Sequence, residues 1–251
     1  MRIIITGTKG NLGSKFNDYC KKKKIKTITL NNFDNINVRE KVDALIHFHF
    51  FISKKKNSIL NKKNLENIKK IADYCMKNKI KIVFISSCSV NLKLNNYSSS
   101  KKQCEQYLIE LKKNKKINLV ILRLFNVYSS NTKTRGVIPD LYKKIKKYKR
   151  IKIDNYLNQR DFIHSEDVFN LIQKTLKNKS EGTFDVGSGK SISIINLAKK
   201  IKKILNKNIF IIKGIKKTKK NNFSRANILK TKKVFSWKNK IDLNEGLEKI
   251  A

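Results

Sequence analysis

The sequence predicts an α/β protein with a doubly wound parallel sheet and a smaller C-terminal lobe. Short apolar runs rich in β-branched residues alternate along the chain with longer amphipathic stretches. Runs that are apolar at nearly every position are typical of strands covered by helices on both faces. The 251 residues suffice for one large domain with its own core, or for a domain with an added lobe.

The predicted elements follow one another in regular order. A first strand, residues 2–6, leads through a glycine-bearing loop into a helix that extends to residue 24. The later strands are predicted at residues 25–30, 43–48, 81–86, 118–124 and 182–186, and the later helices at residues 60–78 and 97–113. Alternating strands and helices of this kind build a parallel sheet with crossover helices.

The loop after the first strand, TGTKGNLG, fits a phosphate-binding turn. Gly7 permits a tight turn, Gly10 lets the backbone approach a pyrophosphate, and Gly13 allows the helix to pack closely on the strand. Free N–H groups at the start of the next helix attract phosphate. We therefore expect this loop to bind a dinucleotide through Gly7, Lys9, Gly10, Asn11, Leu12 and Gly13.

The end of the second strand bears on the choice of cofactor. NAD sites commonly place an acid there to hold the ribose hydroxyls, but this chain has Asn31. Neutral Asn31 would not repel a 2′-phosphate, and Lys9 in the glycine loop could pair with one. These residues favour NADP over NAD, and Asp34 remains a candidate for the role of the acid.

The net charge of +41 raises the question of nucleic-acid binding. Lysine supplies 52 of the basic residues and arginine only 7, and Lys, Asn and Ile together make 117 of the 251 residues. AT-rich codons favour these three types, whereas readers of phosphates and bases use the forked guanidinium of arginine. We therefore expect solvated basic surfaces and no specific nucleic-acid partner.

The remaining composition indicates a cytoplasmic protein. No apolar run approaches the length of a membrane span, and the N-terminus has no signal-peptide layout. The four cysteines are scattered without CxxC spacing, so reduced thiols are expected. We expect neither a membrane partner nor a metal site.

A Tyr-x-x-x-Lys pair has the residues for proton transfer beside a hydride acceptor, because a nearby ammonium lowers the pKa of a phenol. Eight tyrosines among 52 lysines predict about 1.7 such pairs by chance. The chain has four, which begin at Tyr19, Tyr97, Tyr142 and Tyr148. Only Tyr97 follows a central strand that ends in serines, so Tyr97 and Lys101 are the predicted pair.

The order of the motifs resembles one family nearly from end to end. The chain is similar to the extended short-chain dehydrogenases/reductases, which are NAD(P)-dependent nucleotide-sugar epimerases, dehydratases and reductases. LIHFHF resembles the family's VIHLAA strand, and NYSSSK resembles its YxxxK motif. The other similar segments are TGTKGNLG, NLENIKKIADYC, FISSCSVN, LRLFNVY, QRDFIHSEDV, GTFDVGSGKSISI and VFSWKNKIDLNEGL.

The resemblance implies a domain division. A Rossmann-type NAD(P)-binding domain would comprise residues 1–125, with residues 161–187 returning to it. Residues 126–160 and 188–251 would form the substrate-binding lobe. A homodimer is compatible with the resemblance.

The resemblance also implies roles for single residues. Ser87 corresponds to the family's catalytic Ser/Thr, Tyr97 to its acid/base, and Lys101 to the lysine that tunes the tyrosine and holds the ribose. Asn31, Phe48 and Lys101 would add to the cofactor contacts. Asn126 would contact the nucleotide-sugar and Arg160 its diphosphate; the structural alternatives are a strand-end cap and an ion pair with Asp161.

Three departures narrow the function. Cys88 and Ser89 stand where 4,6-dehydratases have Asp-Glu, so dehydration is not expected. Residues 31–42 are too few for the family's additional strand–helix excursion. The nine residues between Ser87 and Tyr97 form a loop much shorter than the family's, which predicts a less enclosed substrate.

The predicted function is therefore NAD(P)-dependent epimerisation or keto-sugar reduction on a nucleotide-activated sugar. The same three residues serve both reactions. The alternative is a non-catalytic relative that binds cofactor or RNA, which the charge and the short loop would suit. His47 and His49 are expected to be packed rather than catalytic, and Trp237 to pack in the C-terminal lobe.

Overall fold

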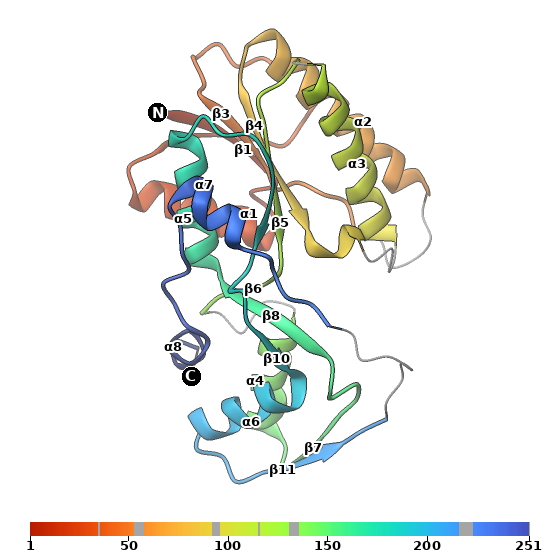
Figure 1. Ribbon diagram of the computed structural model, residues 1–251, viewed down its shortest axis with the longest axis vertical. Coiled ribbons are helices and arrows are strands. Elements are labelled where there is room, and N and C mark those ends of the chain that lie inside the picture. Colours follow the sequence, from red (N-terminus) through yellow and green to blue (C-terminus); the bar gives the residue numbers. More distant parts are fainter. Residues whose placement is uncertain are drawn as a thin grey trace. The chain divides into compact units, whose positions relative to one another are not determined.

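The computed structural model describes residues 1–34, 36–52, 58–91, 96–114, 116–130, 136–215 and 223–250 (Figure 1). The chain divides into two compact units. The first contains Met1–Leu124 and Leu171–Phe184, and the second contains Phe125–Asn170 and Asp185–Ala251. The segment that returns to the first unit is thus shorter than the residues 161–187 expected from the sequence.

The sheet of the first unit has six strands in the order β2-β1-β3-β4-β5-β9. These are β1 (Arg2–Thr6), β2 (Lys26–Leu30), β3 (Ala44–His47), β4 (Lys81–Ser87), β5 (Leu119–Leu124) and β9 (Gly182–Val186). The pairs from β2 through β5 are all parallel, which confirms the expected sheet. The described residues between β2 and β3 form neither helix nor strand, so the excursion is omitted as predicted.

Helices cover both faces of this sheet, as the apolar strand sequences require. α2 (Ser58–Lys77) and α3 (Asn96–Lys113) lie side by side on one face, and α1 (Asn11–Lys22) lies on the other (Figure 1). Successive strand residues point to opposite faces, so alternate side chains enter the two layers. The layer under α2 and α3 contains Ile4, Leu45, Ile68, Phe84, Cys104, Leu108 and Ile121, all fully buried.

The second unit has two small sheets. β6 (Asn126–Tyr128) pairs in parallel with β8 (Gln159–His164), and β10 (Ser191–Ser193) pairs antiparallel with β8. β7 (Arg150–Ile153) and β11 (Phe210–Lys213) form a parallel pair. The helices are α4 (Val137–Lys147), α6 (Ile194–Ile204), α7 (Leu229–Phe235) and α8 (Leu243–Glu248), and α5 (Ser165–Lys177) begins in this unit.

The core of the second unit lies among α4, α6 and α8. Tyr142 is fully buried there, and its hydroxyl donates to the carbonyl of Leu247 at 2.5 Å. Tyr142 begins one of the rejected Tyr-x-x-x-Lys pairs, so its phenol has a structural role. Burial raises its pKa to about 12, which keeps the hydroxyl protonated as a donor.

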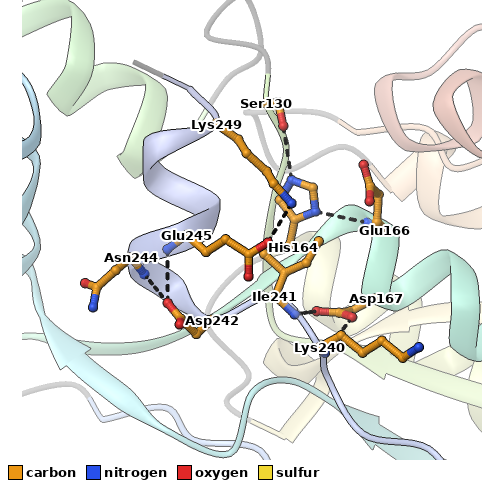
Figure 2. Close-up of polar contacts among 10 residues, drawn as sticks. All are labelled: Ser130, His164, Glu166, Asp167, Lys240, Ile241, Asp242, Asn244, Glu245 and Lys249. Carbon is orange, nitrogen blue, oxygen red and sulfur yellow. Dashed lines mark hydrogen bonds and ion pairs between the residues drawn. The ribbon is translucent and has the colours of Figure 1, made fainter.

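The C-terminal segment is anchored on the carboxylate of Asp167 (Figure 2). Its two oxygens accept from the backbone N–H groups of Lys240 at 2.8 Å and Ile241 at 3.1 Å. Trp237, which is 2% exposed, donates from its indole nitrogen to the backbone carbonyl of Asp167 at 3.1 Å. The predicted packing role of Trp237 is confirmed.

His164 ends β8 beside this anchor and has a defined tautomer. The N–H of Glu166 donates to its Nδ1 at 3.4 Å, so Nδ1 is an acceptor and Nε2 carries the proton toward Ser130 Oγ at 3.3 Å (Figure 2). Burial lowers the pKa of His164, which favours this neutral form. Its contacts identify it as a link between β8 and α5.

All four cysteines are free thiols, as expected. In the described part of the chain, no helix is both long enough and apolar enough to cross a membrane.

Candidate active site

The glycine loop has the close backbone contacts that its sequence predicts. Gly7 adopts φ +75°, and a Cβ there would lie 2.5 Å from the backbone nitrogen of His49. A Cβ on Gly13 would lie 2.3 Å from the carbonyl oxygen of Gly7. Side chains at these positions are excluded, and α1 begins directly after Gly10. These contacts fix the tight turn that the glycine motif predicts, and its contact with a pyrophosphate stays a prediction.

The other loop residues predicted to bind cofactor lie around this backbone turn. Lys9 and Asn11 are exposed, and Leu12 is half-buried in the first turn of α1. Phe48, just after β3, packs its ring against Phe16 of α1 at 5.4 Å between centroids. The structure thus places Lys9 at the loop surface, where a phosphate can reach it.

At the end of β2, the two candidate residues have different environments. Asn31 is exposed and follows the last strand residue. Asp34 accepts a hydrogen bond from Lys70 at 2.5 Å, and this bond together with the Lys70 charge lowers the pKa of Asp34. Because its carboxylate is already paired, Asp34 is less available than Asn31 for a ribose contact.

His47 ends β3 and is packed, as expected, whereas His49 lies two residues beyond the strand. His47 is 1% exposed, and its Nδ1 lies 2.8 Å from Thr6 Oγ1 of the neighbouring strand. Burial, together with the charge of Lys101, holds the pKa of His47 well below its usual value, so the ring is neutral. The backbone N–H of His49 donates to the same hydroxyl at 3.3 Å. This bond ties the residues after β3 to the start of the glycine loop.

Ser87 and Tyr97 meet at the carboxyl end of β4. Ser87 is the last residue of β4, and Tyr97 lies in the first turn of α3. A side-chain hydrogen bond joins them. Ser87 Oγ also accepts from the backbone N–H of Ser89 at 3.2 Å in the short 3-10 helix Cys88–Asn91. Residues 92–95 of the short loop lie outside the described residues, but the two ends of the loop do converge.

The structure also distinguishes the two serines of the sequence pair. Ser86 is 3% exposed, and its Oγ has no hydrogen-bond partner in the described part of the chain. Ser87 is half-buried and bonded to Tyr97. Because successive strand side chains point to opposite faces, Ser87 and not Ser86 contacts Tyr97, and the orienting role of Ser87 stays a prediction.

The pKa of Tyr97 differs in direction from the expectation. Burial raises it to about 12, and the hydrogen bond with Ser87 opposes this rise only in part. From the sequence, the ammonium of Lys101 is expected to lower this pKa. In this structure Lys101 Nζ is directed to the carbonyl of Ile85, so the desolvation of Tyr97 dominates.

Lys101 lies one helical turn after Tyr97 and is 2% exposed. Its ammonium donates to the carbonyl of Ile85 at 2.6 Å. The ring centroids of Phe50 and Phe84 lie 4.0 and 4.6 Å from Nζ. Burial lowers the pKa of Lys101 to about 7, although the charge of Glu105 is among the groups that favour its protonated form.

Two contacts that support the candidate site have partners that could not be predicted from the sequence. Asn64 of α2 accepts from the N–H of Phe51 at 2.9 Å and donates to its carbonyl at 3.1 Å and to Ser100 Oγ at 3.3 Å. It therefore fixes the segment after β3 against α3. The segment NLENIKKIADYC marks a supporting asparagine by resemblance, but only the fold identifies these partners.

The second supporting contact is a bidentate ion pair of Glu105, which lies one helical turn after Lys101. Arg123 of β5 donates to both carboxylate oxygens of Glu105, with a shortest distance of 2.6 Å. Glu105 is 2% exposed, so this geometry satisfies a buried charge. In the sequence, Glu105 lies one turn after Lys101 and Arg123 lies in an apolar strand. Neither their spacing nor the composition indicates that they form an ion pair.

Asn126 and Arg160 both lie in the second unit, on neighbouring strands. Asn126 begins β6 and donates from Nδ2 to the carbonyl of Asp161 at 2.9 Å, which is the contact of a strand-end cap. Arg160 is half-buried in β8 and donates to the carbonyl of Gln159 at 2.8 Å. Their roles toward a substrate stay predictions.

Asp161 is the buried charge of this region. Its carboxylate accepts from Ser188 N and Oγ at 2.7 Å each, from Gly189 N at 2.9 Å and from Ala226 N at 3.0 Å. These donors satisfy both oxygens without a positive side chain. Asp161 thus joins three separate segments of the second unit.

The first unit has the architecture of a doubly wound α/β protein. Parallel strands end at one edge of the sheet, and the glycine loop after β1 and Ser87 at the end of β4 both lie at that edge. This is the edge at which doubly wound α/β proteins bind dinucleotides.

Comparison with known proteins identifies the family within that class. The model of the NAD-dependent epimerase/dehydratase family matches residues 3–187. The ADP-L-glycero-D-manno-heptose-6-epimerase of Brachyspira hyodysenteriae is 32% identical over 217 residues, which cover 76% of this chain and 67% of that protein. The chain belongs to the NAD-dependent epimerase/dehydratase family and is an enzyme of that type, as its sequence predicts.

Solved structures show the same fold. The RMD protein of Pseudomonas aeruginosa, complexed with NADPH, matches with a TM-score of 0.85 and 18% identity over 99% of this chain and 97% of that one. The UDP-glucose 4-epimerase of Thermotoga maritima, with UDP-glucose, matches with a TM-score of 0.83 and 17% identity over 100% and 97%. The Rossmann-type fold is confirmed.

Proposed function

We propose that this protein transfers hydride at a carbon of a nucleotide-activated sugar, as an epimerase or a keto-sugar reductase. The observation that carries the proposal is the hydrogen bond between Ser87 and Tyr97, with Lys101 one turn further along α3. The substrate class is supported by the relatives: one is named for an ADP-linked heptose, and another is a UDP-glucose 4-epimerase with UDP-glucose.

The three side chains have separate tasks. A bound nicotinamide supplies a carbon that accepts the hydride and its electron pair, or returns them. In the oxidative direction, the proton of the sugar hydroxyl passes to Tyr97 Oη while the hydride leaves the same sugar carbon, so that a C=O bond forms. In the reductive direction, Tyr97 Oη returns a proton to the carbonyl oxygen. Ser87 Oγ donates to that oxygen and keeps it in line with Tyr97.

The protonation states favour the reductive half-reaction. With a pKa of about 12, Tyr97 holds its proton at neutral pH and is ready to act as the acid. Action as a base requires a positive charge beside the phenol, which Lys101 supplies when it is protonated and directed to Tyr97. Because the pKa of Lys101 is about 7, its charge changes within the physiological range.

The cofactor is NADP or NAD, and this chain favours NADP. Asn31 is neutral and exposed at the end of β2, so no charge there repels a 2′-phosphate. The carboxylate of Asp34 is paired with Lys70. Lys9 is exposed in the glycine loop and could pair with the added phosphate.

The predicted substrate residues add recognition of the nucleotide. The forked guanidinium of Arg160 suits two oxygens of a diphosphate. The amide of Asn126 would have to exchange its bond to the Asp161 carbonyl for a bond to the ligand. We further propose a cytoplasmic location and a homodimer, for which gel filtration is the check.

The test is turnover with a panel of UDP-, ADP-, GDP- and dTDP-linked sugars and keto-sugars. Absorbance of the reduced nicotinamide follows the cofactor, and NMR of the sugar follows the product. Stoichiometric consumption identifies a reductase, whereas a changed sugar with recycled cofactor identifies an epimerase. No conversion anywhere in the panel would contradict the proposed substrate class.

A further inference from the structure

The residue that covers Lys101 is Phe50, which lies three residues after the end of β3. Residues 47–51 read HFHFF, an unbroken run of aromatic side chains.

The ring of Phe50 contacts both members of the Tyr–Lys pair. Its centroid lies 4.0 Å from Lys101 Nζ, within the range of a cation–π contact. The ring also meets Tyr97 edge-on, with centroids 5.5 Å apart and planes at 84°. The clamp of Asn64 on the backbone of Phe51 fixes the position of the preceding residue. Phe50 is therefore held in place by the fold.

The surroundings of Lys101 contain few groups that could replace this ring. Within the described part of the chain, the ammonium has one carbonyl, that of Ile85, and the faces of Phe50 and Phe84. An ammonium has three N–H donors, and the carbonyl of Ile85 accepts from one of them.

The titratable groups around Lys101 do not neutralise it directly. Cys104 and Glu105 lie on its own helix, and Glu105 is engaged with Arg123 of β5. His47 and His49 face it from β3 and the residues that follow, and the charge of Lys101 contributes to lowering the pKa of both. The charge state of Lys101 therefore depends strongly on how much water reaches it.

We propose that Phe50 is a positioning residue for Lys101: its ring excludes water from the ammonium and holds Nζ against the carbonyl of Ile85. The catalytic meaning of this role rests on the proposed function: with Nζ held at the Ile85 carbonyl, Tyr97 keeps the proton that the reductive direction requires. The exclusion of water and the ring face have opposite effects. Dehydration disfavours the charged amine, whereas the negative face of the ring favours it.

Two substitutions separate these effects. Phe50→Ala admits water, so the titration midpoint of Lys101 should rise from about 7 toward the ordinary value of 10.5. Phe50→Leu keeps an apolar cover but removes the ring face, so the midpoint should fall. We expect each proton affinity to change by about tenfold. Phe51→Leu is the matched control, because the Phe51 ring contacts His49 and Lys63.

The measurement is an NMR titration of protein with isotope-labelled lysine side chains. The Lys101 signal is assigned by its loss in Lys101→Arg. Opposite shifts in the two Phe50 variants and none in the control are the expected result. Unchanged midpoints, or shifts in one direction that the control shares, would overturn the proposal. Thermal unfolding checks that each variant is folded, and Phe50→Leu retains enough apolar volume to provide the test if Phe50→Ala does not fold.

Failure of this proposal can be distinguished from failure of the proposed function. The titration needs neither substrate nor turnover. If the midpoints move as expected but no nucleotide-sugar is converted, the role of Phe50 stands and the reaction does not. If sugars are converted and the midpoints do not move, the reaction stands and Phe50 only fills space. In an active enzyme, the pH profile of turnover should move with the Lys101 midpoint in each variant.

Discussion

Two buried charges, Lys101 in the first unit and Asp161 in the second, are held in opposite ways. Asp161 is fully buried and accepts four hydrogen bonds, three from backbone N–H groups and one from a serine hydroxyl. Lys101 is 2% exposed, and among the described residues its Nζ donates to one carbonyl and lies over two aromatic rings. A charge that is fully hydrogen-bonded stabilises the fold. A buried charge with few hydrogen-bond partners raises the free energy of the folded state. Such groups are typical of functional sites.

The largest loss of stability is expected when the carboxylate of Asp161 is removed. Asp161→Ala leaves the donors of Ser188, Gly189 and Ala226 without an acceptor. Each unsatisfied buried donor costs about 1–3 kcal/mol, so we expect a loss of about 3–5 kcal/mol in the free energy of unfolding. Urea denaturation measures it. The exposed Asp140 of α4 provides the control, and Asp140→Ala should cost about 1 kcal/mol or less. Equal losses in the two variants would contradict the structural role of Asp161.

Replacing Lys101 with an uncharged side chain should increase the free energy of unfolding, whereas Asp161→Ala should decrease it. Its pKa of about 7 in the folded chain lies below the ordinary 10.5, so between these values the unfolded chain binds more protons. The stability of the wild type therefore rises with pH across this window, and the full cost of the buried charge is present below about pH 7. Lys101→Met should be more stable than the wild type by roughly 2–4 kcal/mol at pH 7 and below.

This advantage of Lys101→Met should disappear as the pH approaches 10.5. Urea denaturation at several pH values measures it, with Lys102→Met on the same helix as the control. A Met variant that is less stable than the wild type at pH 6 would show that Lys101 is held for structure, like Asp161.

The two serines at the end of β4 should differ in their effects on turnover. Ser87→Ala removes the hydroxyl that bonds Tyr97 and orients the reacting oxygen, so turnover should fall by about 10-fold to 100-fold. Ser86→Ala removes a buried hydroxyl without a partner in the described chain and should leave turnover within about twofold. Steady-state kinetics on the converted sugar measures both. A larger effect at Ser86 would reassign the site.

The smallest effect concerns the cofactor. Asn31→Asp places a negative charge at the end of β2, where it would repel a 2′-phosphate and accept from ribose hydroxyls. One such interaction near a solvated surface is worth about 1 kcal/mol, or about fivefold in affinity. Titration calorimetry should show weaker NADP binding and stronger NAD binding than in the wild type. Unchanged affinities for both would mean that Asn31 does not face the ribose.

Much of the first unit could be predicted from sequence because its determinants are local. Strand 182–186 is predicted to the residue, and the Gly7 and Gly13 contacts follow from motif spacing. Ser87, Tyr97 and Lys101 could be chosen because β4 ends in serine and α3 begins nine residues later.

What could not be predicted depends on contacts between distant segments. The direction of the Tyr97 pKa reflects burial by the whole fold, and the cover over Lys101 comes from Phe50, which lies 51 residues earlier in the chain. The Glu105–Arg123 pair likewise joins a helix and a strand whose register only the sheet defines. No periodicity or composition carries these pairings.

The central claim is that Tyr97 performs the proton transfer, and one comparison of variants tests it directly. Tyr97→Phe keeps the ring that meets Phe50 but removes the hydroxyl, whereas Tyr148→Phe alters a 49% exposed tyrosine that also has a lysine four residues later. Turnover of the converted sugar should fall by about 10²–10⁴-fold in Tyr97→Phe, with cofactor affinity retained, and should be unchanged in Tyr148→Phe. Full turnover in Tyr97→Phe would contradict the account.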